Sequence, residues 1–359
     1  MSNKNRMKTT AVAVLAALLS FLIGNAWVFI SADMFVRYFY EARMVALTHV
    51  FTLGWVSLMI VGVLRQLAPL AFGLKLERRG LIGLGIALWI PGLAAMVAGF
   101  ATLIYGVAAA GTSLVFVAAI IINVVLLQGF LGIRRDPAHH HMLAALLYFA
   151  GAALLGTWMG LSKGLDFPLP ASFHRVLFAH IHLAGAGWAG MMILAVMSCL
   201  FPQPLLRHPI QARIRFAGFN VGLIGLTGGL LLGSDWYGVF GSLLAVACVW
   251  YAIAFIPIVL EFGQQSDRST AFLVSSWTCL AAVAVISLWF SIVATAATPF
   301  CDKAPIRLWI RLHVRMAEFH DSGHVVSNHS NPCFEIPLRA GNRGGGGMRR
   351  TFIDPALQI

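Results

Sequence analysis

Long apolar runs alternate with short polar segments over most of the chain. The runs cover residues 10–31, 43–66, 80–105, 110–133, 141–162, 173–200, 213–234, 238–262 and 270–298. About 20 apolar residues are enough for an α-helix to cross a bilayer, so each run predicts one spanning helix. The pattern therefore predicts an all-α membrane bundle of about nine transmembrane helices. The first run follows Lys4, Arg6 and Lys8, a pattern that also fits a signal peptide.

Two of the runs are similar to each other. Residues 46–69 and 179–202, aligned without a gap at an offset of 133, agree at nine of twenty-four positions, where apolar composition alone would give about two or three. The even number of helices between them makes the copies parallel, and the first run has an equivalent in the second copy, which favours a helix there. The predicted organisation is a first four-helix repeat (1–135), a second four-helix repeat (136–265), one helix of a third repeat (266–298) and a polar tail (299–359).

Composition strengthens the membrane prediction and removes one class of partner. Hydrophobic residues make up 59% of the chain, charged residues 11%, and the mean hydropathy is +0.84. The net charge of +12 would suggest nucleic acid for a soluble protein, but here the basic residues cluster in alternate loops between apolar runs. We therefore expect a lipid bilayer and no nucleic acid as partner, with the N-terminus in the cytoplasm. Five cysteines without CxxC or CxxCH spacing indicate neither a disulfide framework nor covalently attached haem.

Three histidines inside apolar runs are the candidate functional residues. They are His49 in the first copy of the duplication, His182 at the equivalent position of the second, and His180, which stands opposite Leu47. An imidazole in hydrocarbon needs a partner, and helix-to-helix hydrogen bonds are the simplest explanation for any one of them. Three at a matched depth favour ligands of haem iron or copper. Residues two apart on a helix differ by about 200° in direction, so His180 and His182 serve different sites.

Other polar residues are weaker candidates. Arg65, Arg175 and Glu261 lie close enough to helix ends for their side chains to reach the interface. His139, His140 and His141 follow a basic segment and favour a solvated loop over a metal site, and His174 is expected at the outer end of its helix. His320 and His324 have HxxxH spacing within the tail, where no spanning run or clear periodicity is found.

A family resemblance adds to this interpretation. LTHVFTLGWVSLMIVGVLRQLAP and FHRVLFAHIHLAGAGWAGMMILAVMSCLFP resemble the repeated core helices of the haem-copper oxidase subunit I superfamily, especially its small oxidase-like branch. The resemblance covers about residues 10–298 and implies a haem b, with His49 and His182 as its two axial ligands. His180 would then bind a second haem or a copper. It further implies a bacterial-type inner membrane, a redox partner subunit or cytochrome, and electron transfer or binding of nitric oxide or dioxygen.

The chain also departs from that family. Position 184, where a copper-site histidine region is expected, is Ala, and the seventh predicted helix has no histidine. The His-x-His pair of the family's tenth helix stands on helix six here, and no mid-membrane acid is available for a proton pathway. A copper and complete dioxygen reduction are therefore not supported, and no catalytic residue is assigned. Whether the chain is an enzyme stays open.

A transporter or metal-delivery protein is the alternative function from another class. Such a protein would use His174, His180 and His182 transiently, and transporters carry broken helices at matching places in both halves. Only Pro91 in the third predicted helix hints at such a break, and the seventh helix lacks a matching proline.

Overall fold

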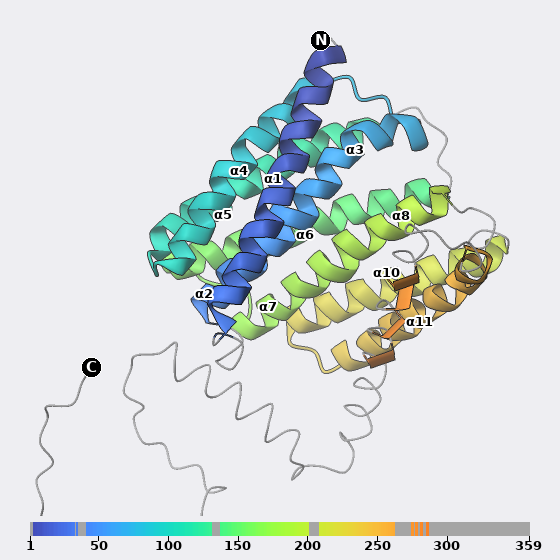
Figure 1. The fold of residues 1–359 in the computed structure, drawn as a ribbon. Coiled ribbons are helices and arrows are strands. Elements are labelled where there is room, and N and C mark those ends of the chain that lie inside the picture. Colours follow the sequence, from blue (N-terminus) through green and yellow to red (C-terminus); the bar gives the residue numbers. More distant parts are fainter. Residues whose placement is uncertain are drawn as a thin grey trace, which may run out of the picture. The chain divides into compact units, whose positions relative to one another are not determined.

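The computed structural model describes residues 3–32, 34, 41–130, 137–200 and 208–262, with four helical pairs at 274–275, 277–278, 281–282 and 285–286. All of them lie in the first of the chain's two units, Met1–Arg307. Every regular element within these ranges is a helix (Figure 1). In chain order they are α1 (Asn3–Ile30), α2 (Ala42–His49), η2 (Val50–Ser57), α3 (Leu58–Ala71), α4 (Arg79–Ala101), α5 (Tyr105–Gln128), α6 (Pro137–Leu165), α7 (Phe173–His182), η3 (Leu183–Gly190), α8 (Met191–Leu200), α10 (Pro209–Leu232) and α11 (Tyr237–Phe262).

Eight helical stretches in the described part of the chain are long and apolar enough to cross a membrane. Each contains 22 to 30 residues, which exceeds the roughly 20 needed to span the hydrocarbon layer. The predicted all-α membrane bundle is therefore confirmed, and the lipid bilayer is its environment. The ninth predicted helix, together with the polar tail, lies almost entirely outside the described residues.

Two of the spans change helix type in the middle. In the span Ala42–Ala71, the π-helical segment η2 joins α2 to α3, and in the span Phe173–Leu200 the π-helical segment η3 joins α7 to α8. A π-helix hydrogen-bonds one residue further along the chain than an α-helix and is often found at functional sites. His49 and His182 each stand directly before one of these segments. The offset of 133 that aligns the two sequence copies superimposes η2 on η3 residue for residue.

The same offset relates the remaining helices. It aligns α1 with α6, α4 with α10 and α5 with α11, and the first residues of the paired helices then agree within a few positions. Packing repeats as well, because α1 lies against η2 and α3, whereas α6 lies against η3 and α8. Close approach needs glycine in both copies. A Cβ on Gly54 would lie 2.8 Å from Ser20 of α1, and one on Gly187 would lie 2.6 Å from Tyr148 of α6.

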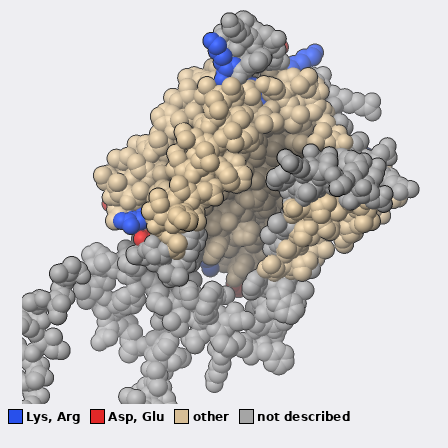
Figure 2. Space-filling model, in the orientation of Figure 1, with Lys and Arg blue, Asp and Glu red and all other residues tan. Residues whose placement is uncertain are grey.

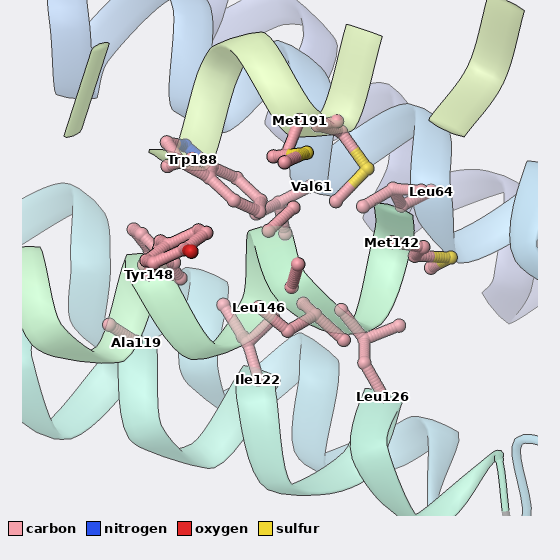
Figure 3. Packing of buried hydrophobic residues seen from close by; sticks show 14 of the residues in the cluster. Val61, Leu64, Ala119, Ile122, Leu126, Met142, Leu146, Tyr148, Trp188 and Met191 are labelled. Carbon is pink, nitrogen blue, oxygen red and sulfur yellow. The ribbon is translucent and has the colours of Figure 1, made fainter. Parts of the chain in front are cut away.

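The two sets of helices share one hydrophobic core. Figure 3 shows Ile122 and Leu126 of α5 facing Leu146 of α6, with side chains of α3 and α8 above them. These residues are nearly or fully buried, and α5 and α6 form the main contact between consecutive sets. Because lipid is as apolar as these side chains, tight packing rather than hydrophobicity holds the helices together. The core fixes the two sets against each other on one side of the site.

Among the described residues, charged side chains follow the membrane pattern apart from two buried arginines. On the face in Figure 2, Lys and Arg gather toward the ends of the helices and the band between is uncharged. Arg65, however, is only 4% exposed and Arg215 only 5%. Arg65 is covered by the surrounding helices. The guanidinium of Arg215 lies over the rings of Trp250 and Tyr251, at 5.8 and 5.6 Å from their centroids.

Candidate functional site

A cavity of about 490 Å³ lies between the two sets of helices. Its walls come from α2 and η2 on one side, from α7 and η3 on the other, and from α4, α5 and α6. Most of the lining is aliphatic or aromatic. Cofactor and small-molecule pockets have volumes of roughly 300–1,000 Å³ with apolar walls and a few placed polar groups, so this cavity is large enough to hold a cofactor.

His49 of α2 and His180 of α7 both line this cavity and face each other. Their ring centroids are 6.4 Å apart, and their planes differ by 29°. The phenyl ring of Phe100, which belongs to α4, lies nearly parallel to the His49 ring, with centroids 6.4 Å apart and an interplanar angle of 13°. One imidazole therefore comes from each copy of the duplicated helix. Leu47, which occupies the position equivalent to His180, is buried in the protein and does not line the cavity.

Backbone carbonyls fix the protonation of both rings. Nδ1 of His49 lies 2.7 Å from the carbonyl oxygen of Val45, and Nδ1 of His180 lies 2.9 Å from that of Ala152 on α6. A carbonyl oxygen can only accept, so Nδ1 is the donor and carries the proton in each ring. In a neutral imidazole this leaves a lone pair on Nε2. Metal-binding histidines are oriented in this way in most proteins.

A glycine on α6 sets the position of the His180 ring. A Cβ built on Gly156 would lie 2.9 Å from Cε1 of His180 and 3.3 Å from its Nδ1. The ring therefore lies close to the backbone of α6, next to the Ala152 carbonyl that it binds. Gly185 of η3 lines the same cavity, but a Cβ there would meet nothing within 4 Å. Both glycines line the cavity, but only Gly156 is in contact with His180.

Trp188 lines the cavity and joins the two π-helical segments. Its indole Nε1 donates a hydrogen bond of 3.1 Å to the Ser57 hydroxyl of η2. The indole also stacks on Phe149 of α6, with centroids 4.3 Å apart, and Phe149 stacks on Trp89 of α4 at 5.7 Å. Trp188 is 3% exposed and Trp89 fully buried. This wall of the cavity is aromatic and closely packed.

His182 does not line the cavity. Its Nδ1 donates to the carbonyl oxygen of Phe178 at 2.7 Å, and the ring is half-buried. The structure thus places His180 beside His49 in the cavity, whereas the sequence-based prediction pairs His49 with His182. Equivalent residues of two parallel repeats point in the same sense around a bundle. Because His49 points toward the second repeat, the equivalent His182 points away from the first repeat. His180 lies about 200° from His182 around the helix and therefore points toward the first repeat.

The other histidines do not join this site. His139, His140 and His141 belong to the first turn of α6, so the predicted solvated loop is wrong. His139 is bound through Nε2 to the carbonyl oxygen of Phe72 and His141 through Nε2 to the hydroxyl of Tyr251, both at 2.7 Å. His174 lies in the first turn of α7, half-buried beside Phe173. The HxxxH pair of the tail falls outside the described residues.

The sequence did not predict three residues that line the cavity, namely Gly156, Phe100 and Lys163. Lys163 is the only lysine or arginine among the described residues that line the cavity. The sequence does mark Lys163, since it directly follows the fifth apolar run and the offset of 133 places it on Ile30, the last residue of α1. Gly156 and Phe100 carry no such signal, because their roles depend on contacts between helices.

Groups of three or more His, Cys, Asp or Glu side chains that could hold a metal ion are absent from the part of the chain that the structure describes. Of the His, Cys, Asp and Glu side chains described, only the imidazoles of His49 and His180 line the cavity, next to the thioethers of Met96 and Met159. A bare zinc or copper ion normally needs three or four protein ligands, so this donor set does not suit one.

Comparisons with protein-family models, with curated proteins and with solved structures gave no match for this chain.

Proposed function

We propose that the protein is a haem-binding integral membrane protein in which His49 and His180 are the two axial ligands of one haem b. The observation that carries the proposal is that the two imidazoles face each other across an apolar cavity, each with Nδ1 bound to a carbonyl. The resemblance of the two histidine helices to the haem-copper oxidase subunit I superfamily supports it.

The separation of the rings fits this cofactor. If both Nε2 atoms are directed at one metal, two metal–imidazole bonds of about 2 Å, with about 1 Å from each nitrogen to its ring centre, place the ring centroids about 6 Å apart. The observed separation is 6.4 Å. Because a porphyrin supplies four nitrogen ligands itself, two imidazoles complete the coordination, whereas they would leave a bare ion under-coordinated. This favours haem over the transporter or metal-delivery alternative.

Each residue then has a defined task. A bound haem would supply a one-electron iron couple, which suits electron transfer. The Val45 and Ala152 carbonyls hold the two imidazoles in the tautomer that presents Nε2. Phe149 and Trp188 exclude water from the cavity wall and thereby lower the local dielectric. With both axial positions held by imidazole, this site would transfer electrons and would not bind a gas.

His182 is the candidate for a second haem. Its ring is held through Nδ1 in the same way as that of His49, which leaves Nε2 available. A haem held by this histidine alone would keep an open sixth position for nitric oxide, carbon monoxide or dioxygen. We assign no copper and no catalytic residue. An electron donor, either a partner subunit or a cytochrome, is part of this proposal.

The proposed location is a bacterial-type inner membrane with the N-terminus in the cytoplasm. The support is the clustering of Lys and Arg before α1 and in alternate loops, which is typical of cytoplasmic segments.

The experiment is to purify the protein in detergent, quantify haem per chain and record the reduced-minus-oxidised optical spectrum. We expect one low-spin b-type haem per chain from His49 and His180, and any second haem, held by His182, to be high-spin. A protein that is folded but contains no haem, and takes up none when haem is added, would contradict the proposal.

A further inference from the structure

A charged side chain lines the cavity, whose other walls are mostly apolar. Lys163 lies in the last turn of α6 and lines the cavity together with His49 and His180. Its ammonium nitrogen lies 5.1 Å from the ring centroid of Phe173 and 5.9 Å from that of Tyr105. These two rings, from α7 and α5, hold the lysine at the cavity by cation–π contacts. The side chain is half-buried.

The helical register places this charge at a defined height above the imidazoles. Lys163 follows Gly156, which contacts the His180 ring, by seven residues, so both lie on nearly the same face of α6, about 10 Å apart along the axis. On α7, Phe173 precedes His180 by the same spacing, and its ring lies against Lys163. Both helices therefore place the ammonium about two turns from the facing imidazoles. This is comparable with the distance from the iron of a haem to its carboxylates.

We propose that Lys163 binds an anionic group of the molecule in the cavity, and that this group is a propionate carboxylate of the haem. The inference rests on the proposed haem function and adds the orientation of the ligand. The apolar body lies between His49 and His180, and the carboxylate edge lies toward the end of α6. An ammonium at an apolar rim attracts a carboxylate more strongly than it would in water, because the local dielectric is low.

The rate of haem release from variants of Lys163 distinguishes the contribution of its charge from that of its packing. The variants are Lys163→Met, which keeps length without charge, Lys163→Arg, which keeps the charge, and Lys75→Met as a matched control at an exposed lysine outside the cavity. The measured quantity is the rate at which the purified protein transfers haem to a high-affinity apoprotein acceptor. A charge-assisted pair predicts release about tenfold faster, or more, from Lys163→Met. Lys163→Arg should largely restore slow release, and Lys75→Met should match the wild type.

Haem dimethyl ester, in which both propionates are uncharged, provides the second arm. The wild type should release the ester about as fast as Lys163→Met releases haem, and Lys163→Met should have no further effect on the ester. Equal release of haem from the wild type and Lys163→Met would overturn the role of Lys163 while leaving the haem proposal intact. An equal effect of Lys163→Met on haem and on its ester would also overturn it. A wild-type protein that takes up neither compound would overturn both proposals.

Discussion

The imidazole rings of His49 and His180 face each other with centroids 6.4 Å apart and planes inclined by 29°. One ring is carried by each copy of a duplicated helix, so the site exists only where the two copies meet. The contact depends on the backbone of a third helix, α6, through the Ala152 carbonyl and Gly156. Several consequences of this arrangement can be measured.

The variant Gly156→Ala should displace the His180 ring, because the new Cβ would lie 2.9 Å from its Cε1. We expect a lower content of low-spin haem, with part of the iron losing one axial ligand. The matched control is Gly185→Ala, which adds the same methyl group to the same cavity without meeting any atom within 4 Å. Electron paramagnetic resonance of the two oxidised variants measures their content of low-spin iron and of iron that has lost an axial ligand. Identical low-spin signals in the two variants would contradict the contact.

Removing the bond between Trp188 and Ser57 should destabilise the protein without removing haem. Trp188→Phe keeps an aromatic ring on Phe149 but loses the indole donor, and Ser57→Ala removes the acceptor. Each should lower the free energy of unfolding in detergent by about 1 kcal/mol, a usual value for such a hydrogen bond. The double variant should lose less than the two single losses combined. Strictly additive losses would show that the two side chains are not coupled.

Tyr251→Phe tests the structural role of His141. The substitution removes the hydroxyl at 2.7 Å from Nε2 of His141 and leaves the ring in place. We expect a loss of stability of about 1 kcal/mol, because a buried ring nitrogen is left without its partner. Haem content should not change, since neither residue lines the cavity. Loss of haem in this variant would point to a second cofactor region at that end of the helices.

A chain that ends near Thr298 should insert into membranes and bind haem as the full chain does. The reason is compositional, since the segment from Cys301 to Ile359 contains no spanning run. The amount of protein in the membrane fraction and its haem content provide the measurement. A truncated chain that inserts but lacks haem would contradict the prediction.

The alternation of apolar and polar segments was enough to predict the all-α membrane bundle. Offset sequence similarity located the two histidine helices, because repeated packing of equivalent helices restricts residue choice at the same positions. Gly54 and Gly187 show this restriction, since both are required for close approach of a neighbouring helix.

The pairing of the histidines could not be predicted in the same way. His49 and His182 occupy equivalent positions, so each points in the same direction relative to its own repeat. Two ligands of one iron must instead point toward each other. The burial of His139 and Arg65 was missed for a related reason. Their surroundings come from distant segments, such as the Phe72 carbonyl that binds His139, and no local pattern records these contacts.

The most direct measurement of the central claim is the low-spin haem spectrum of three purified variants, His49→Ala, His180→Ala and His182→Ala. Each removes one intramembrane imidazole whose Nδ1 is bound to a backbone carbonyl, so the three are closely matched. Thermal unfolding and gel filtration of each variant check that the fold persists. We predict that His49→Ala and His180→Ala abolish the low-spin spectrum and that His182→Ala keeps it. Loss of the spectrum in His182→Ala with retention in His180→Ala would contradict the account.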